Sequence, residues 1–304
     1  MSVRTLGALV LLSAAPVALV ATPSVAQQGS LAKPMSPELK AAYAEIEETF
    51  GFVPSFARSF PGAALPGAWE EMRDLEMNPN TALRAKYKSL IGVAVASQIP
   101  CAYCLYFDSQ GARMDGATDE EVNEAIAMSA LTRHWSTVLN GLNLDMAQFR
   151  SDVDGILAFA ANASNRPAPE AIPVTDAESA YHDMEQTMGR VPAFMKAFPE
   201  ASIAGAWKEF KGLQMNPNTA VPNKYKELIG LAVAAQIPCA YCVEAHTAFA
   251  KANGATDQEV AEAVGMAAMT RHWSTVLNGS QQPFDEFKAE ADRMFKHVSQ
   301  SASK

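Results

Sequence analysis

Basic residues are scarce in this sequence: 24 lysines and arginines stand against 33 aspartates and glutamates, a formal charge of −9. Nucleic-acid binding requires a basic surface that neutralises phosphates, so the charge argues against a nucleic-acid partner. Charged residues make up only 19% of the chain and hydrophobic residues 49%, which is typical of a globular protein and not of a disordered one. With 304 residues, the chain is long enough for two domains that each bury a core.

The apolar N-terminus is too short to be a membrane anchor. The run from Leu6 to Val20 holds about 15 residues, includes Pro16 and falls short of the ~20 that span a bilayer. Arg4 precedes it and a small-x-small sequence at residues 24–26 follows it, which is the pattern of a secretory signal. We predict that residues 1–26 are a signal peptide cut after Ala26. The mature protein would then be periplasmic or secreted, without a membrane anchor.

Cysteines are also few, and all four belong to two C-x-x-C pairs, Cys101 with Cys104 and Cys239 with Cys242. An exported protein can hold structural disulfides. A C-x-x-C pair, however, closes almost no loop and therefore adds little stability. The spacing favours cysteines that are present for their reactivity.

Strand-type patterns are weak, because β-branched alternation is rare and Ala, Leu, Met, Glu and Lys are frequent. Instead the chain repeats itself at a constant offset of 138 residues: Met77–Ala82 recurs as Met215–Ala220, and Arg133–Gly141 recurs unchanged as Arg271–Gly279. Two repeats are too few for a solenoid. We predict an all-α fold of two tandem helical domains, residues 27–150 and 176–290, with a linker at 151–175 and a C-terminal tail at 291–304.

Local signals place the second C-x-x-C pair at the start of a helix. A helix is predicted from Asn223 to Gln236, because the following Ile237-Pro238 disfavours helical geometry. The next helix is predicted from Cys239 to about Asn253, with Gly254 as its C-cap. Thr256 with Glu259 forms a capping box that starts a third helix, predicted to end at Asn278 before Gly279.

The second pair has the spacing of a redox site. Cys239 and Cys242 are three residues apart and His246 follows four residues later, so all three share one helix face. A helix N-terminus stabilises a thiolate, and the imidazole of His246 can take the Cys242 proton. A thiolate with a second thiol one turn away can reduce a peroxide: a sulfenic acid forms and then condenses to a disulfide.

Glu227 lies twelve residues before Cys239 on the preceding predicted helix. An antiparallel helix hairpin can bring its carboxylate to the redox face. There it would orient His246 and act as the terminal proton acceptor.

The pattern Glu227-x11-Cys239-x2-Cys242-x3-His246 resembles the signature of the alkylhydroperoxidase D / carboxymuconolactone decarboxylase-like family, as do the runs Lys224–Ala234 and Gly254–Val260. The resemblance covers roughly residues 83–141 and 221–279. It implies an all-helical, usually oligomeric protein with hydroperoxide reductase activity. It also implies that Cys242 attacks the peroxide, Cys239 is the resolving thiol, and Glu227 with His246 is the proton relay.

The first repeat departs from this pattern at two of four positions. Ser89 stands where the second repeat has Glu227, and Asp108 stands where it has His246. A carboxylate beside Cys104 opposes its ionisation. We therefore predict a degenerate site in which Cys101 and Cys104 are the less reactive pair, with slower alkylation of Cys104 than of Cys242. A permanent Cys101–Cys104 disulfide is an alternative.

The leading hypothesis is a thiol-dependent alkyl hydroperoxide reductase, without cofactor or metal, that takes a hydroperoxide and an unidentified thiol electron donor and forms homo-oligomers. The same cysteines would also serve a thiol–disulfide oxidoreductase acting on proteins. A carboxymuconolactone decarboxylase-like lyase is a further hypothesis, although lactone decarboxylation does not need paired thiols. The sequence is also compatible with a non-catalytic binding module and with a four-thiolate zinc site.

Overall fold

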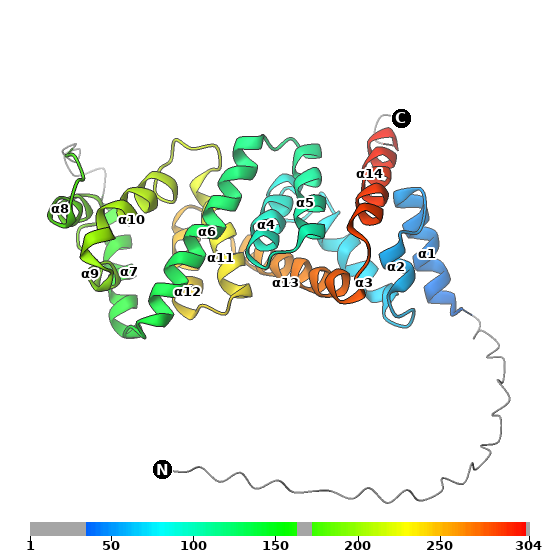
Figure 1. Cartoon of the computed structure of the whole chain (residues 1–304), viewed down its shortest axis with the longest axis horizontal. Coiled ribbons are helices and arrows are strands. Elements are labelled where there is room, and N and C mark those ends of the chain that lie inside the picture. Colours follow the sequence, from blue (N-terminus) through cyan, green and yellow to red (C-terminus); the bar gives the residue numbers. More distant parts are fainter. Residues whose placement is uncertain (1–34, 163–171, 302–304) are drawn as a thin grey trace, which may run out of the picture. The chain divides into compact units, whose positions relative to one another are not determined.

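The computed structural model describes residues 35–162 and 172–301 of the protein (Figure 1). The predicted signal peptide and its cleavage site lie outside the described residues, as do residues 163–171 of the predicted linker. From Ser36 onward the described residues form one compact unit. Within the described ranges there is no β-strand, so the all-α prediction is confirmed.

The two repeats contribute corresponding series of helices. In the first repeat these are α1 (Pro37–Phe50), α2 (Ser55–Ser59), α3 (Leu65–Glu71), the π-helix η1 (Met72–Glu76), α4 (Ala85–Gln98), α5 (Ala102–Met114), α6 (Asp119–Gly141) and α7 (Met146–Ala161). In the second they are α8 (Ala177–Met188), α9 (Ala193–Ala197), α10 (Glu200–Leu213), α11 (Asn223–Gln236), α12 (Ala240–Ala252), α13 (Asp257–Ser280) and α14 (Phe284–Ser301).

Most of the predicted helix ends are found where local chemistry places them. The helix before the second C-x-x-C pair runs from Asn223 to Gln236, and the capping box of Thr256 and Glu259 starts α13. The prediction that Gly279 ends this helix is wrong, because α13 continues to Ser280. Gln281 takes the left-handed position that closes it. A glycine inside a helix costs only about 1 kcal/mol, so it does not by itself end one.

Helices α4 and α11 lie at the centre of the unit, where each contacts the other and the long helices α6 and α13. Their central turns are apolar on all sides, which is the pattern of a helix with no solvent face, and every residue from Leu90 to Ala96 and from Leu228 to Ala234 is buried. Tyr87 of α4 stacks on its own counterpart, Tyr225 of α11. A residue that meets its repeat equivalent marks a pseudo-two-fold axis between the repeats.

The repeats exchange their last helices. Helix α7 of the first repeat packs on α8, α9 and α12 of the second, whereas α14 at the C-terminus packs on α1 and α5 of the first (Figure 1). The boundaries expected at residues 150 and 290 fall inside these two helices. Each repeat therefore completes its packing with a helix that belongs to the other.

Polar contacts repeat this exchange on both sides of the axis. Glu124 of α6 accepts hydrogen bonds from the backbone N–H groups of Ala220 and Val221, at 2.9 and 2.6 Å. Its counterpart Glu262 accepts from Ala82 and Leu83, at 2.8 and 2.7 Å. The two carboxylates satisfy loop N–H groups just ahead of α11 and α4, and so fix α6 and α13 across the axis.

The tyrosine of each C-x-x-C segment makes the same kind of contact. Tyr241 donates to the carbonyl oxygen of Leu144, and Tyr103 donates to that of Gln282, both at 2.5 Å. Each cysteine-bearing helix is thus tied to a loop of the other repeat. Among the described helices, none is long and apolar enough to cross a membrane.

Candidate active site

The second C-x-x-C pair occupies the N-terminus of α12. Cys239 is the N-cap, and its sulfur accepts a hydrogen bond from the backbone N–H of Cys242 at 3.2 Å. The two sulfurs are joined in a disulfide, with the Cα atoms 5.3 Å apart. Cys239 is fully buried and Cys242 is 5% exposed. The pair therefore sits at the positive end of the helix dipole, which stabilises the thiolate of the reduced form.

Glu227 and His246 form a buried hydrogen-bonded pair beside these cysteines. The antiparallel packing of α11 on α12 brings Glu227 Oε2 to 2.7 Å from His246 Nδ1. A carboxylate only accepts hydrogen bonds, so Nδ1 carries the proton in this contact. Nε2 of a neutral imidazole is then left unprotonated and able to accept a proton.

Two further residues, which the sequence did not single out, hold this pair. The side-chain amide of Gln214, just after α10, donates to Glu227 Oε1 at 3.1 Å. Thr132 of α6 lies with its hydroxyl 3.5 Å from His246 Nε2. Thr132 belongs to the first repeat, so the second-repeat site contains a polar group from each repeat.

Gly230 makes room for the imidazole. A Cβ atom at this position of α11 would collide with the ring of His246. Gly92 of α4 stands in the same relation to Asp108 in the first repeat. A glycine facing the acid–base residue is thus part of both sites.

A mostly apolar chamber of about 260 Å³ opens beside the second-repeat site. Gln214, Glu227, Cys242 and His246 line it. About half of its apolar wall comes from the first repeat, including Leu131, Trp135 and Leu139 of α6 and Phe149, Val153 and Ile156 of α7. No lysine or arginine lines the chamber among the described residues. The chamber therefore offers mostly apolar contacts, with its polar side chains gathered near Cys242.

The first-repeat pair has the same backbone setting. Cys101 is the N-cap of α5, and its sulfur accepts from the N–H of Cys104 at 3.2 Å and is joined to the Cys104 sulfur. Asp108 is buried one turn later. Ser89 does not take the place of Glu227 at the site, because its hydroxyl is bonded to Asp115, just after α5. The structure thus brings Asp108 to the cysteines and leaves Ser89 apart.

Glu76 is a site residue that the sequence pattern did not single out. It ends η1 at the position that corresponds to Gln214, and it lines a cavity of about 50 Å³ together with Cys104 and Asp108. Burial raises the pKa of Asp108 well above its usual range, and the negative charge of Glu76 raises it further. Burial therefore acts against the ionisation of Asp108, on which the expected effect of its charge on Cys104 depends. That Cys104 is less reactive than Cys242 stays a prediction.

Cys104 and Cys242 line separate cavities that share no residue. Among the described residues no group of three or more His, Cys, Asp or Glu side chains could hold a metal ion, so a four-thiolate zinc site lacks its geometry. Each cavity instead combines one cysteine of a pair with acid–base side chains. A duplicated helical protein with a thiol pair and titratable groups in each repeat is the class of protein that fold and site define.

The family follows from the comparison with known proteins. The family model described as the carboxymuconolactone decarboxylase family matches residues 63–145 and 188–281, more than half of the chain and once in each repeat. The chain belongs to this family. The resemblance predicted from the Glu-Cys-Cys-His pattern and the tandem organisation are both confirmed.

Two known proteins are similar to this chain. "Uncharacterized protein 4 in cox locus" of Paracoccus denitrificans is 33% identical over 85 residues, which are 27% of this chain and 77% of that protein. A solved structure from Burkholderia xenovorans, provisionally named a gamma-carboxymuconolactone decarboxylase subunit, is 16% identical with a TM-score of 0.51 and covers 88% of this chain and 100% of its own. At that identity the likeness concerns the fold alone.

Proposed function

We propose that the second-repeat site reduces apolar organic hydroperoxides with the electrons of the Cys239–Cys242 dithiol. The observation that carries this proposal is the buried Glu227–His246 contact at 2.7 Å on the wall that also holds Cys242. A thiol, a base and a carboxylate that orients the base are the parts of an activated sulfur nucleophile.

The reaction balances with these residues. His246 Nε2 accepts the Cys242 proton, and the thiolate attacks the outer oxygen of the hydroperoxide while the O–O bond breaks. The alkoxide leaves with the proton that His246 holds, as an alcohol, and Cys242 becomes a sulfenic acid. The Cys239 thiol then displaces water and forms the disulfide. An external thiol donor returns the two electrons.

The chamber disfavours two competing functions, lactone decarboxylation and disulfide exchange with proteins. A lactone that carries carboxylates would lie there without a cation, and an unpaired buried charge is costly. A disulfide of a folded protein would have to reach Cys239 and Cys242, residues that are only 0% and 5% exposed. A small uncharged hydroperoxide faces neither obstacle.

The proposal is tested by reading each cysteine pair separately by mass spectrometry. The protein is reduced, mixed with one equivalent of cumene hydroperoxide and quenched with an alkylating reagent. We expect fast disulfide formation at Cys239–Cys242, slowed about a hundredfold in Glu227→Gln and His246→Ala, because general acid–base catalysis contributes roughly 10²–10⁴-fold.

The double variant Cys101→Ser with Cys104→Ser is the control, and it should leave this rate unchanged. If Cys242 reacts no faster than a free thiol, the peroxidase proposal fails. Lyase activity or partner binding that survives in Cys242→Ser would then take its place.

A further inference from the structure

The first-repeat cavity contains two carboxyl groups, Glu76 and Asp108, that have no hydrogen-bond partner among the described residues. Asp108 is 7% exposed, and neither it nor Glu76 makes a hydrogen bond to another described side chain or backbone group. Both line the cavity beside Cys104, among aromatic and methionine side chains. Asp108 is buried and Glu76 is half-buried. Removing a carboxyl group from water without a hydrogen-bond partner is costly, so the placement of these two beside a reactive sulfur requires an explanation.

The titratable side chains occupy different positions in the two repeats. In the second repeat, the carboxylate of Glu227 on α11 bonds to the imidazole of His246 on α12, and Gln214 donates to that carboxylate. In the first repeat the position of Gln214 holds a carboxylate, Glu76, and the position of His246 holds a second one, Asp108. Two titratable groups therefore face Cys104 on one cavity wall, as two face Cys242.

The surroundings of Glu76 and Asp108 affect the pKa values of the two carboxyl groups differently. Burial raises the pKa of Glu76 to about 7, while the Lys88 ammonium group of α4 acts to lower it. Asp108 is raised well above its usual pKa by burial and by the charge of Glu76. The other elements at the cavity, α13 and α14, contribute the uncharged Thr270, Trp273 and Phe287. The Lys88 charge favours the ionised form of Glu76, whereas burial and the charge of Glu76 favour the protonated form of Asp108. Glu76 is therefore the group suited to accept a proton and Asp108 the group suited to give one, as in other unequal carboxyl pairs.

We propose that the first-repeat cavity is a second peroxide-reducing site, specific for hydrogen peroxide, in which Glu76 is the base and Asp108 the acid. Glu76 takes the Cys104 proton, and the thiolate attacks one oxygen of hydrogen peroxide while the O–O bond breaks. Asp108 protonates the leaving hydroxide to water. Cys104 becomes a sulfenic acid, and the Cys101 thiol displaces a second water to form the disulfide. A thiol reductant restores both thiols.

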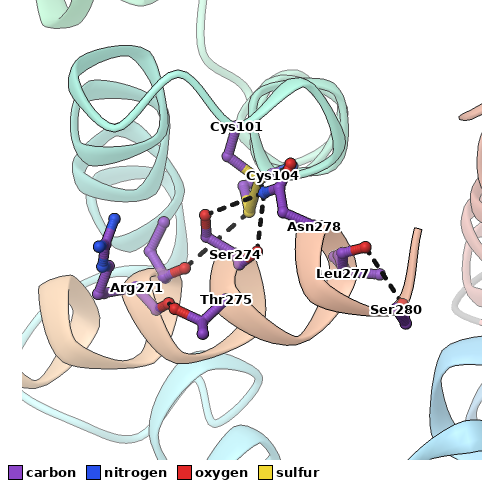
Figure 2. The surroundings of a disulfide bond; sticks show 9 residues. Cys101, Cys104, Arg271, Ser274, Thr275, Leu277, Asn278 and Ser280 are labelled. Atoms are coloured by element: carbon purple, nitrogen blue, oxygen red, sulfur yellow. Dashed lines mark hydrogen bonds between the residues drawn. A yellow bond between two sulfur atoms is a disulfide. The ribbon is translucent and has the colours of Figure 1, made fainter. Parts of the chain in front are cut away.

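The resolving cysteine also has a partner. Asn278 of α13 donates a hydrogen bond from its side-chain amide to the Cys101 sulfur at 3.6 Å, while it also donates to the Ser274 carbonyl (Figure 2). An N–H group aimed at sulfur stabilises the thiolate form. Cys101 is thereby prepared to attack the Cys104 sulfenic acid.

The size of the cavity selects the substrate. Its volume of about 50 Å³ compares with about 260 Å³ in the second repeat. Phe107 lines it where the second chamber has Ala245, and its ring packs on Phe295. A buried water needs a cavity volume of roughly 10–15 Å³, counted as the space open to a water-sized probe. Hydrogen peroxide, with two heavy atoms, fits this cavity, and a branched or aromatic hydroperoxide does not.

The test uses the full-length protein with both pairs reduced. Hydrogen peroxide or cumene hydroperoxide is added, and the Cys101–Cys104 peptide is read by mass spectrometry from pH 5 to 9. We expect hydrogen peroxide to oxidise this pair at least about tenfold faster than free cysteine, with a rate that rises as Glu76 ionises near pH 7. Cumene hydroperoxide should leave it reduced.

Glu76→Gln and Asp108→Asn keep the side-chain shape and are the deciding variants. Each should slow oxidation of Cys104 about tenfold or more, and Glu76→Gln should also remove the rise near pH 7. Equal rates and pH profiles in Glu76→Gln and the parent protein would overturn the proposal. The Cys239–Cys242 peptide in the same samples is the control. This inference rests on the same sulfur chemistry as the proposed function. Oxidation is measured separately at the Cys101–Cys104 peptide and at the Cys239–Cys242 peptide, so either proposal can be overturned without the other.

Discussion

Gly230 fixes the position of His246 in the second-repeat site through the absence of a Cβ atom. Its hydrogen faces the imidazole of His246, and a methyl group there would displace the ring from Glu227. The imidazole matters through its orientation, because only Nε2 is free to take the Cys242 proton when Nδ1 bonds to the carboxylate.

We expect Gly230→Ala to slow peroxide-driven oxidation of Cys242 about tenfold or more, since a misplaced base loses most of its effect. Stopped-flow mixing of the reduced protein with cumene hydroperoxide measures this. Gly212→Ala on α10 is the matched control, because a Cβ atom there meets no neighbour within 4 Å. Equal rates in both variants would show that the reaction does not depend on the present position of the His246 ring.

Ala245 sets the size of the second-repeat chamber. Its counterpart Phe107 lines the much smaller first cavity. Replacing Ala245 by Phe should exclude cumene hydroperoxide from Cys242 while hydrogen peroxide still reacts. We expect the ratio of the two rates to change about tenfold or more, since a filled apolar pocket loses a few kcal/mol of binding. An unchanged ratio would mean that the substrate enters elsewhere.

At the scale of elements, the long helices α6 and α13 are held across the pseudo-two-fold axis by carboxylates. Burial acts to raise the pKa of Glu262, but the N–H groups of Leu83 and Ala82 outweigh it, so its pKa lies below the usual 4.5. A carboxyl group with a depressed pKa stabilises the fold above pH 4.5, and this contribution is lost as the pH falls through the folded value.

Glu262→Gln should therefore lower the free energy of unfolding by about 1–3 kcal/mol at pH 7, because one backbone N–H then faces an amide donor. The difference from the parent protein should shrink below about pH 4.5. Urea unfolding at about pH 7 and about pH 3.5 tests both statements. Glu209→Gln, on the exposed side of α10, should change neither value. A loss that persists undiminished at the acid pH would contradict the role of the charge.

The elements also show what a sequence can and cannot predict. Helix ends that depend on neighbouring residues, such as the Thr256 capping box and the proline after α11, were predictable because their chemistry is local. The exchange of α7 and α14 was not, since periodicity tells which face of a helix is apolar but not which helix covers it. For that reason the sequence did not predict that Thr132 and α7 belong to the second-repeat site.

Glu76 was not predicted as a site residue for a different reason. The four-residue signature directs attention to positions 89, 101, 104 and 108, and Glu76 lies outside it. Alignment of the two repeats at every position would have shown a carboxylate opposite Gln214. Its importance depends on its reaching the same cavity as Asp108, which only the fold shows.

The described residues from Ser36 onward form one compact unit, in which the first repeat supplies about half of the apolar wall of the second repeat's site. A protease site inserted between residues 163 and 171 should give a cut protein whose halves stay together in gel filtration at micromolar concentration. Oxidation of Cys242 by cumene hydroperoxide should continue in this cut protein. Residues 172–304 produced alone should lose that reaction, because α6 and α7 are then missing. Activity in the isolated half would contradict the shared site.

The exchange of helices has a consequence for symmetry. Two separate copies of one repeat, paired in the same way, would hold two identical sites, because every change in one copy would appear in both. Joining the copies in one chain removes that restriction. Phe107 and Ala245 can differ, as can Asp108 and His246, while α6 and α13 keep both walls in place. The duplication thus allows one scaffold to hold two unlike reaction chambers in a fixed one-to-one ratio.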